Sequence, residues 1–380
     1  MTATNHILEI ETLGQSIWMD NLSRDLIESG ELKQMIAEQG IQGITSNPAI
    51  FEKAIAGNAV YDADIEAGIK AGKSVEEIYE ALTFDDIRHA CDIFLPVYEQ
   101  SNGLDGYVSI EVSPRIAKDT EATLREARRY YAEIGRPNVM IKIPGTPAGL
   151  PAVEKAIAAG INVNVTLLFS IESYVETAWA YIRGLEARAE AGQDISKIAS
   201  VASFFLSRID SKIDDALDAH LQQASGKQAE RLKQVKGKVA IANAKLAYQE
   251  YKKIIQSERW QALAAKGAKV QRLLWASTST KNPDYSDVMY VDELVGPDTV
   301  NTLPPNTITA CIDHCDVASR VETDVNEAYQ LIASLSDPDI NINLDQVMAE
   351  LLEEGIDKFV QPFESLLHSL EAKVNRLAAV

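Results

Sequence analysis

A lysine lies inside an apolar segment, where its amine could act as a nucleophile. Lys142 is flanked by Ile141 and Ile143 in the run VMIKIP (residues 139–144). An ammonium group that is buried without good solvation loses pKa by up to several units, which would supply a free amine near neutral pH. Such an amine attacks a ketone or aldehyde to form a Schiff base, whose iminium accepts electrons when the neighbouring carbon–carbon bond breaks.

Two carboxylates end other apolar segments and would serve the proton transfers of that chemistry. Asp20 follows residues 17–19 (IWM), and Glu111 follows residues 108–110 (VSI). Carbinolamine formation, its dehydration and removal of a hydroxyl proton during bond cleavage are all acid/base steps. The competing interpretation is that Lys142 forms a structural ion pair with a carboxylate. Two acids at the ends of separate segments favour the catalytic interpretation.

Amide and hydroxyl side chains occupy similar positions. Asn47 follows Ile44, and Asn164 and Thr166 alternate with valines in residues 163–166 (VNVT). Because side chains alternate across a strand, Asn164 and Thr166 would share one face. These residues could bind a polar substrate beside the lysine.

Short apolar segments alternate with helical patterns along the whole chain. The predicted strands cover residues 17–22, 42–47, 106–112, 138–144, 161–168, 199–205, 270–277 and 299–304. Helical spacing occupies residues 119–134, with Asp119 as its cap, and also residues 149–159, 172–191 and 207–256. Eight alternating strands and helices predict a (β/α)8 TIM barrel, an α/β fold in which the carboxyl ends of all strands meet at the active-site face.

The 380 residues exceed the ~250 of a plain barrel. We assign the surplus to helical insertions at 48–105 and 206–269 and to a tail after about residue 320. With no Ser/Gly/Pro-rich linker in the sequence, residues 1–380 are predicted to form one decorated barrel domain, with residues 335–380 as a C-terminal helical extension that packs on the barrel. Apolar spacing in residues 342–378 predicts amphipathic helices, interrupted at Gly355 and Pro362.

Composition and charge exclude several classes of protein. Thirty-six Lys and Arg against 56 Asp and Glu give a formal net charge of −20, which repels nucleic acid and anionic membranes. The start of the chain resembles no secretory signal and no apolar run reaches ~18 residues, so we expect a cytoplasmic protein without a membrane partner. Three cysteines suit a reducing compartment.

No cofactor or metal is predicted. A GxGxxG motif is absent, and residues 68–74 (GIKAGKS) are one residue short of a phosphate loop. Cys311, His314 and Cys315 lack a second pair of ligands for a structural zinc site, so buried thiols in a helix are expected. The sequence leaves the oligomeric state open, with a homodimer as one candidate.

Six segments in order over nearly the whole chain resemble the transaldolase family, in the form of its longer bacterial-type branch. They are TSNPAIF (45–51), SIEVSP (109–114), MIKIPGT (140–146), NVNVTLLFS (162–170), ASFFLSRID (202–210) and WASTSTKNP (275–283). The resemblance implies a metal-free class I aldolase barrel that transfers dihydroxyacetone between phosphorylated sugars in the non-oxidative pentose phosphate pathway.

The resemblance also implies roles for individual residues. Lys142 would form the Schiff base, and Asp20 would take and return the proton of the substrate hydroxyl. Glu111 would act through a water held by Thr166. The remaining residues that the resemblance places at the substrate are Asn47, Asn164, Ser203, Arg208, Ser277 and Lys281.

The resemblance places the substrate phosphate at Arg208, which matches an arginine of the family shortly after the sixth strand, and a guanidinium can hold a phosphate through two hydrogen bonds. The competing interpretation is a helix-surface ion pair of Arg208 with Asp210 or Asp214. Shorter relatives have an arginine near Ser279, which leaves open whether Lys281 substitutes for it. Two other functions also stay open: a fructose 6-phosphate aldolase-type lyase using the same lysine, and a barrel that has become a binding scaffold.

Overall fold

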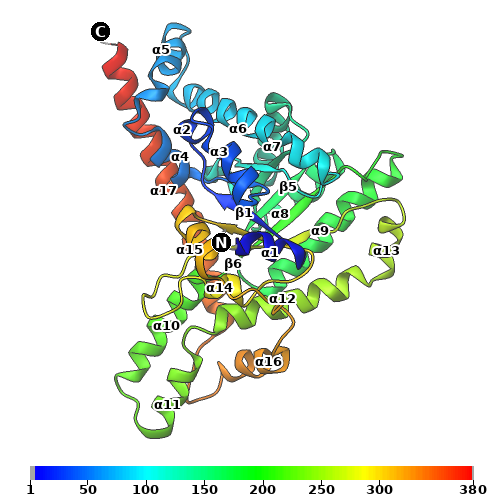
Figure 1. The fold of residues 1–380 in the computed structure, drawn as a ribbon, viewed down its shortest axis with the longest axis vertical. Coiled ribbons are helices and arrows are strands. Elements are labelled where there is room, and N and C mark those ends of the chain that lie inside the picture. The colour runs from blue at the N-terminus through cyan, green and yellow to red at the C-terminus, as the bar shows by residue number, and fades with distance from the viewer. Residues whose placement is uncertain (1–4, 379–380) are drawn as a thin grey trace.

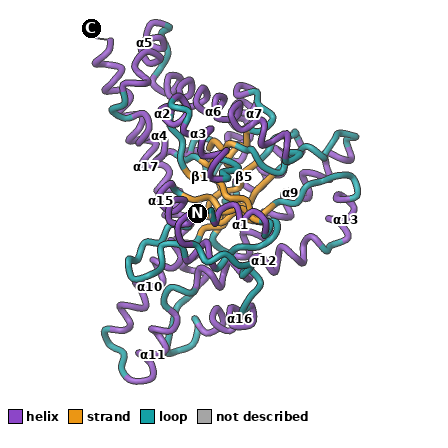
Figure 2. Tube along the Cα trace, viewed as in Figure 1, coloured by secondary structure: helices purple, strands orange, loops and turns teal. Residues whose placement is uncertain are grey.

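A closed barrel of eight parallel strands forms the centre of the protein, and helices surround it (Figure 2). The computed structural model describes residues 5–378. The strands pair in chain order, and β1 closes the barrel against β8. Their bounds are β1 Gln15–Asp20, β2 Ile44–Thr45, β3 Val108–Glu111, β4 Val139–Pro144, β5 Val163–Leu168, β6 Ser200–Phe205, β7 Arg272–Ala276 and β8 Thr299–Leu303. The predicted (β/α)8 barrel is confirmed.

Each predicted strand is present, and β2 is shortened most relative to its predicted bounds. Only Ile44 and Thr45 pair regularly, although residues 42–47 were predicted as strand. The Gln42 N–H and the Gly43 carbonyl still bond to β1, at 2.9 Å each. A side chain at Gly43 would collide with the indole of Trp18, since a Cβ there would lie 2.7 Å from the ring. The backbone therefore passes close to a buried aromatic ring before the regular pairing begins.

β4 and β5 are buried along their full length, as expected for parallel strands with both faces covered. Their registers determine which polar residues are neighbours. Lys142 pairs with Glu111 on β3 and with Asn164 on β5, and Pro144 pairs with Thr166. Glu111, Lys142, Asn164 and Thr166, which come from three different strands, thus meet at one end of the barrel.

Helices fill the connections between strands (Figure 1). Short turns of π- or 3-10 helix cover Met35–Gln39, Ala59–Tyr61 and Pro114–Ile116. The α-helices are α1 His6–Thr12, α2 Arg24–Glu28, α3 Glu31–Gln34, α4 Pro48–Ile55, α5 Asp62–Lys70, α6 Val75–Gln100, α7 Thr120–Ile134, α8 Gly149–Ala158, α9 Ile171–Glu190, α10 Ser207–Leu221, α11 Gly226–Val235, α12 Val239–Ile255, α13 Glu258–Ala264, α14 Met289–Asp292, α15 Pro305–His314, α16 Val325–Ser334 and α17 Leu344–Ala378.

Helices α7, α8 and α9 lie within one residue of their predicted bounds, and Asp119 caps α7 by accepting from the Ala122 N–H at 2.9 Å. The continuous helical pattern predicted over 207–256 is wrong. That segment is divided into α10, α11 and α12, with Gly226 at φ 56° and Gly237 at φ 70° near the breaks. Positive φ is available to glycine at little cost, so the chain turns there although apolar spacing continues.

The expected interruptions of the tail are also wrong, because α17 is one helix through Gly355 and Pro362. Proline at 362 removes one backbone hydrogen bond but does not end the helix. Burial of residues on both sides of it, Phe359 and Phe363, holds the helix against its neighbours. Tertiary packing therefore overrides the local preference. Residues 379–380 of the predicted extension lie outside the described residues.

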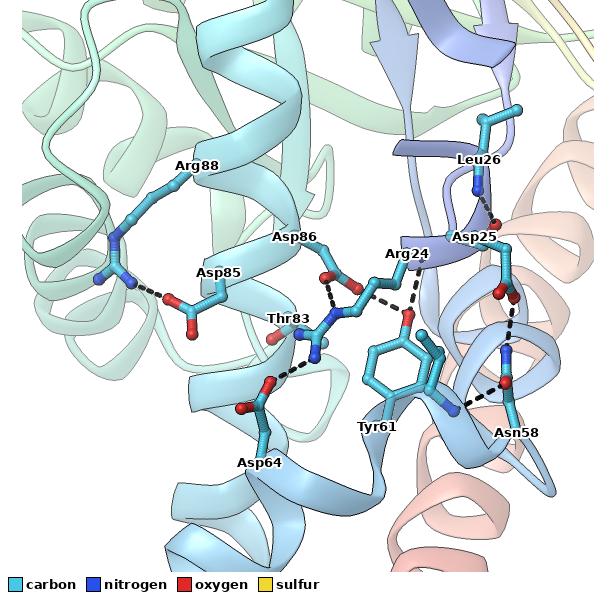
Figure 3. Close-up of polar contacts among 12 residues, drawn as sticks. Arg24, Asp25, Leu26, Asn58, Tyr61, Asp64, Thr83, Asp85, Asp86 and Arg88 are labelled. Atoms are coloured by element: carbon cyan, nitrogen blue, oxygen red, sulfur yellow. Dashed lines mark hydrogen bonds and ion pairs between the residues drawn. The ribbon is translucent and has the colours of Figure 1, made fainter. Parts of the chain in front are cut away.

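The first insertion is tied to the barrel by a buried polar cluster (Figure 3). The Arg24 Nε donates to Asp86 Oδ1 at 2.8 Å, and the Tyr61 hydroxyl donates to Asp86 Oδ2 at 2.7 Å. Arg24 also contacts Asp64. Arg24 belongs to α2, which follows β1, whereas the other three residues belong to the insertion: to the turn before α5, to α5 and to α6. The cluster therefore joins the inserted helices to the segment that follows β1.

Candidate functional site

A cavity of about 320 Å³ opens at the carboxyl ends of the strands. It is lined by eight of the ten predicted site residues: Asp20, Asn47, Lys142, Thr166, Ser203, Arg208, Ser277 and Lys281. Glu111 and Asn164 are buried behind this lining. Barrel geometry explains the gathering, because parallel strands end at the same face.

Lys142 is deeply buried, with 5% of its surface exposed. Its Nζ lies 2.8 Å from Glu111 Oε1 and donates to the Ser46 carbonyl at 2.9 Å. Lys142 therefore has the carboxylate partner that a structural ion pair would have. It also lines the cavity, as a catalytic amine must. Burial raises the pKa of Glu111, and the charge of Lys142 opposes that rise. A carboxyl in contact with the amine is placed to exchange protons with it.

Asp20 is held by a hydroxyl chain that sequence reasoning missed. The Thr45 hydroxyl donates to Asp20 Oδ1 at 2.7 Å, and the hydroxyls of Thr45 and Thr302 lie 2.6 Å apart. Because Thr45 has one hydroxyl proton, Thr302 donates to Thr45 when Thr45 donates to Asp20. Burial raises the pKa of Asp20, whereas the charge of Lys142 and the hydrogen bond from Thr45 lower it. The positions of both threonines at strand ends were the available signal.

The amide and hydroxyl residues differ in how they reach the cavity. Asn47 lines the cavity and caps α4, accepting from the Ile50 N–H at 3.0 Å. Asn164 accepts from the Ser203 hydroxyl at 2.7 Å and donates to Ser109 Oγ at 3.2 Å. Asn164 therefore contacts Ser203, which lines the cavity, but is not itself part of the lining. Thr166 Oγ1 is buried and bonds to no protein group among residues 5–378.

The backbone is unusual at two points of the cavity wall. Leu167, directly after Thr166, has φ 61°, and Ser277 at the end of β7 has φ 55°. The pairing of β5 with β6 shifts register between Val165 and Leu168. Residues other than glycine adopt this region at a cost, and such strain concentrates at functional sites. The Ser277 hydroxyl lies 2.8 Å from that of Ser207 at the start of α10.

Arg208 and Lys281 give the cavity a cationic side. Among the described residues Arg208 forms no salt bridge, and its buried Nη1 has no hydrogen-bond partner. Asp210 and Asp214, the partners of the competing interpretation, bond instead to Tyr290 and Tyr285 at 2.7 and 2.6 Å. Burial lowers the pKa of Lys281, and the charges of Arg208 and Lys53 lower it further. A bound anion would offset the electrostatic repulsion among these cations.

No metal-binding group is found within residues 5–378, where no three His, Cys, Asp or Glu side chains are placed to hold an ion. Cys311 and Cys315 are buried, as expected, and His314 forms ion pairs with Asp287 and Asp313. Over the same residues, no helix combines the length and apolar character that a membrane crossing requires.

The structure is a closed parallel barrel with a buried lysine, a buried Glu111 and a half-buried Asp20 at its mouth. These features define a class of barrel proteins whose site is built around an amine. The family model described as Transaldolase/Fructose-6-phosphate aldolase matches residues 17–370. The chain belongs to this family. It is 73% identical to a transaldolase of Trichodesmium erythraeum, over 99% of this chain and 100% of that protein. It is 73% identical to transaldolase 2 of a Nostoc species and 45% identical to a transaldolase of Saccharopolyspora erythraea, over 100% and 99% of this chain and 100% of each relative.

Proposed function

We propose that this chain is a transaldolase that moves dihydroxyacetone from sedoheptulose 7-phosphate to glyceraldehyde 3-phosphate, giving erythrose 4-phosphate and fructose 6-phosphate. The observation that carries the proposal is the buried Lys142 amine, 2.8 Å from Glu111 and in one cavity with Asp20. Full-length similarity to transaldolases supports it. The chemistry is that of the non-oxidative pentose phosphate pathway.

Catalysis begins when the Lys142 amine attacks the ketone of the donor sugar. Glu111 moves protons during formation and dehydration of the carbinolamine, through a water held by the unpaired Thr166 hydroxyl. Asp20 then takes the proton of the hydroxyl next to the breaking carbon–carbon bond, and the iminium accepts the bonding electrons as an enamine. The enamine carbon adds to the acceptor aldehyde, and Asp20 returns the proton to the new hydroxyl. Water then cleaves the carbon–nitrogen bond of the product iminium, which frees the ketose and the Lys142 amine.

The remaining polar residues orient the two sugars. Asn47 and Ser203 line the cavity and bind hydroxyls of the three-carbon fragment, and Asn164 positions Ser203. Arg208 binds the phosphate with Ser277 and Lys281, because a buried guanidinium without a carboxylate partner favours an anionic ligand. Lys281 thereby provides the second cation of this subsite.

Trapping of the Schiff base tests the proposal. Borohydride reduction in the presence of fructose 6-phosphate should fix a carbohydrate adduct on the peptide that contains Lys142, as seen by mass spectrometry. Lys142→Ala should give no adduct and abolish turnover, while circular dichroism shows a retained fold, since a large-to-small change beside a cavity costs less than one in a packed core. A folded wild-type protein without an adduct would favour the scaffold interpretation.

A lyase that releases free dihydroxyacetone remains the second candidate, because the family model covers both activities by its description. Assaying free dihydroxyacetone with and without an acceptor aldehyde separates the two. A transferase releases little of it in either case, whereas a lyase releases one equivalent for each bond cleaved.

Two further expectations, a cytoplasmic location and a homodimeric assembly, rest on the sequence and remain predictions. Light scattering of the purified protein should give twice the 41.6 kDa of one chain for a homodimer. Fractionation of cells that express the protein tests the location.

A further inference from the structure

The C-terminal helix α17 brings an aromatic ring to the candidate nucleophile. Phe359 lines the same cavity as Lys142, although 217 residues of sequence separate them. The Lys142 Nζ lies over the Phe359 ring, 5.8 Å from its centroid. The ring is 6% exposed, so it covers the cavity wall and faces little solvent. No sequence motif placed this residue near the site.

A close contact one turn earlier in α17 holds the ring in place. A Cβ on Gly355 would lie 2.9 Å from Leu167 Cδ2, so only glycine lets the helix approach β5 this closely. Leu167 is the residue with positive φ that follows Thr166. The helix therefore rests directly on the strand that carries a candidate catalytic residue.

Other contacts fasten α17 along its length, beside α4 and α5 (Figure 1). Lys212 of α10 pairs with Glu350 and Glu354 at 2.9 and 2.5 Å. Further along, Phe363 packs edge-on against Tyr79, with ring centroids 5.4 Å apart. Exposed ion pairs contribute little individually, but together with buried packing they limit how far the helix can move from the cavity.

A phenyl ring at this position has two physical effects on the amine. It occupies space that water would otherwise take, and its negative face attracts a nearby cation. The Schiff base carries positive charge as an iminium and becomes a neutral enamine after bond cleavage. A ring there stabilises the charged forms and keeps water from the enamine.

We propose that Phe359 is a specificity-determining residue, which favours transfer of the dihydroxyacetone unit over its release. Release requires a proton on the enamine carbon, then addition of water to the iminium carbon and breakage of its bond to the Lys142 nitrogen. Transfer instead forms a carbon–carbon bond to the acceptor aldehyde, and water then cleaves the product iminium from Lys142. Both routes therefore end in hydrolysis, and they differ in whether the enamine carbon takes a proton or adds to the aldehyde. By excluding water from the enamine, the ring slows protonation of the enamine carbon, which commits the fragment to release, and leaves addition to the aldehyde open. This inference rests on the function proposed above.

The test compares free dihydroxyacetone released from fructose 6-phosphate with transfer to erythrose 4-phosphate. Phe359→Ala should raise the ratio of release to transfer by roughly tenfold, because both water exclusion and the contact with the cation are lost. Phe359→Leu keeps an apolar side chain and should raise the ratio less than Phe359→Ala does. Equal ratios in Phe359→Ala and the wild type would overturn the proposal.

Leu366→Ala is the matched control, since Leu366 is fully buried two turns later in α17 and does not line the cavity. This substitution loosens the packing of the helix without opening the space at the amine. The ratio of release to transfer in Leu366→Ala should therefore stay at the wild-type value. The same rise in this control would assign the effect to helix mobility and overturn the proposal for Phe359. If the wild-type protein forms no borohydride adduct, the proposed function itself is wrong. That result is distinct from an unchanged ratio in Phe359→Ala and from a raised ratio in Leu366→Ala.

Discussion

Arg208 lines the cavity and has no carboxylate within salt-bridge distance among residues 5–378. Burial lowers the pKa of Arg208, and the charges of Glu111 and Asp20 oppose that effect from a distance. The nearby acids Asp210 and Asp214 are engaged by tyrosine hydroxyls. A buried cation without a direct partner is costly unless a ligand supplies the charge. Its place beside Lys281 fits a phosphate subsite.

Replacing this arginine should weaken binding of phosphorylated sugars. In Arg208→Ala we expect the KM for fructose 6-phosphate to rise by roughly tenfold or more, with a smaller change in kcat, because hydrogen bonds to charged groups are lost. Steady-state kinetics with an acceptor aldehyde measures both constants. Arg183→Ala, which removes an exposed partner of Glu154, should leave the KM unchanged. An unchanged KM in Arg208→Ala would place the phosphate elsewhere.

Individual site residues were predictable to different extents. Lys142, Asp20 and Glu111 were detectable because a charge within or at the end of an apolar strand is unusual in any sequence. Thr45 and Thr302 are common strand residues, and only their 2.6 Å contact across β2 and β8 shows their connection to Asp20. Phe359 lies in an amphipathic helix like many others, so its contact with Lys142 required the packed structure.

At the scale of elements, Asp210 connects α10 with two helices that follow it. Its carboxyl accepts from the Tyr290 hydroxyl at 2.7 Å and from the Ala240 N–H at 2.8 Å. These contacts join α10 to α14 and α12. Burial raises the pKa of Asp210 to about 6. The packing of these helices should therefore respond to pH.

The sign of that response follows from proton binding. An unfolded Asp has a pKa of about 3.9, so the folded state binds this proton more tightly. Its contribution to stability is fully present below about pH 4 and is lost as pH rises through about 6. From pH 4 to pH 7, we expect the free energy of unfolding of the wild type to fall by roughly 2 kcal/mol relative to Asp210→Asn.

Urea unfolding of both proteins across this pH range measures the difference. Other titrating carboxyls are shared by the two proteins and cancel in the comparison. Asp218→Asn, which changes an exposed carboxylate on the same helix, should follow the wild type. Parallel curves for Asp210→Asn and the wild type would contradict the assignment of this proton.

Element boundaries show where local sequence signals were sufficient. Helix α7 was predictable because an Asp119 cap and a clear apolar period agree. Residues 207–256 keep their apolar period across Gly226 and Gly237, so periodicity alone hid the breaks. In α17 the error is reversed, because Gly355 and Pro362 suggest breaks that packing against neighbouring elements prevents.

At the scale of the whole molecule, the two ends of the chain are joined to the same barrel. β1 pairs with β8 through Gln15 and Thr299, and α17 contacts β5 as well as α4, α6 and α10. Opening the barrel, or removing α17 from it, would expose surface that is now buried in the barrel and in the helix. We therefore predict that residues 1–380 unfold as one cooperative unit.

Two probes that report on different parts of the chain test this prediction. Trp18 and Trp275 are fully buried in β1 and β7, and the other two tryptophans lie in α9 and α13. Tryptophan fluorescence therefore reports on the barrel and its surrounding helices but not on α17, which contains no tryptophan. Far-ultraviolet circular dichroism follows the helices, including α17. The two urea transitions should coincide. An earlier loss of helical signal, with intact fluorescence, would show that the tail is a separate unit.

By itself, the sequence determined the barrel and the chemistry that its strand ends carry. Apolar segments alternating with helical patterns specify parallel strands, and parallel strands bring their terminal polar residues to one face. Three features could be seen only in the tertiary structure. They are the contact of α17 with Lys142, the hydroxyl chain to Asp20, and the helix boundaries, with residues 207–256 divided into three helices and α17 continuous. These features depend on contacts between residues far apart in sequence, whose energies local propensity and periodicity do not contain.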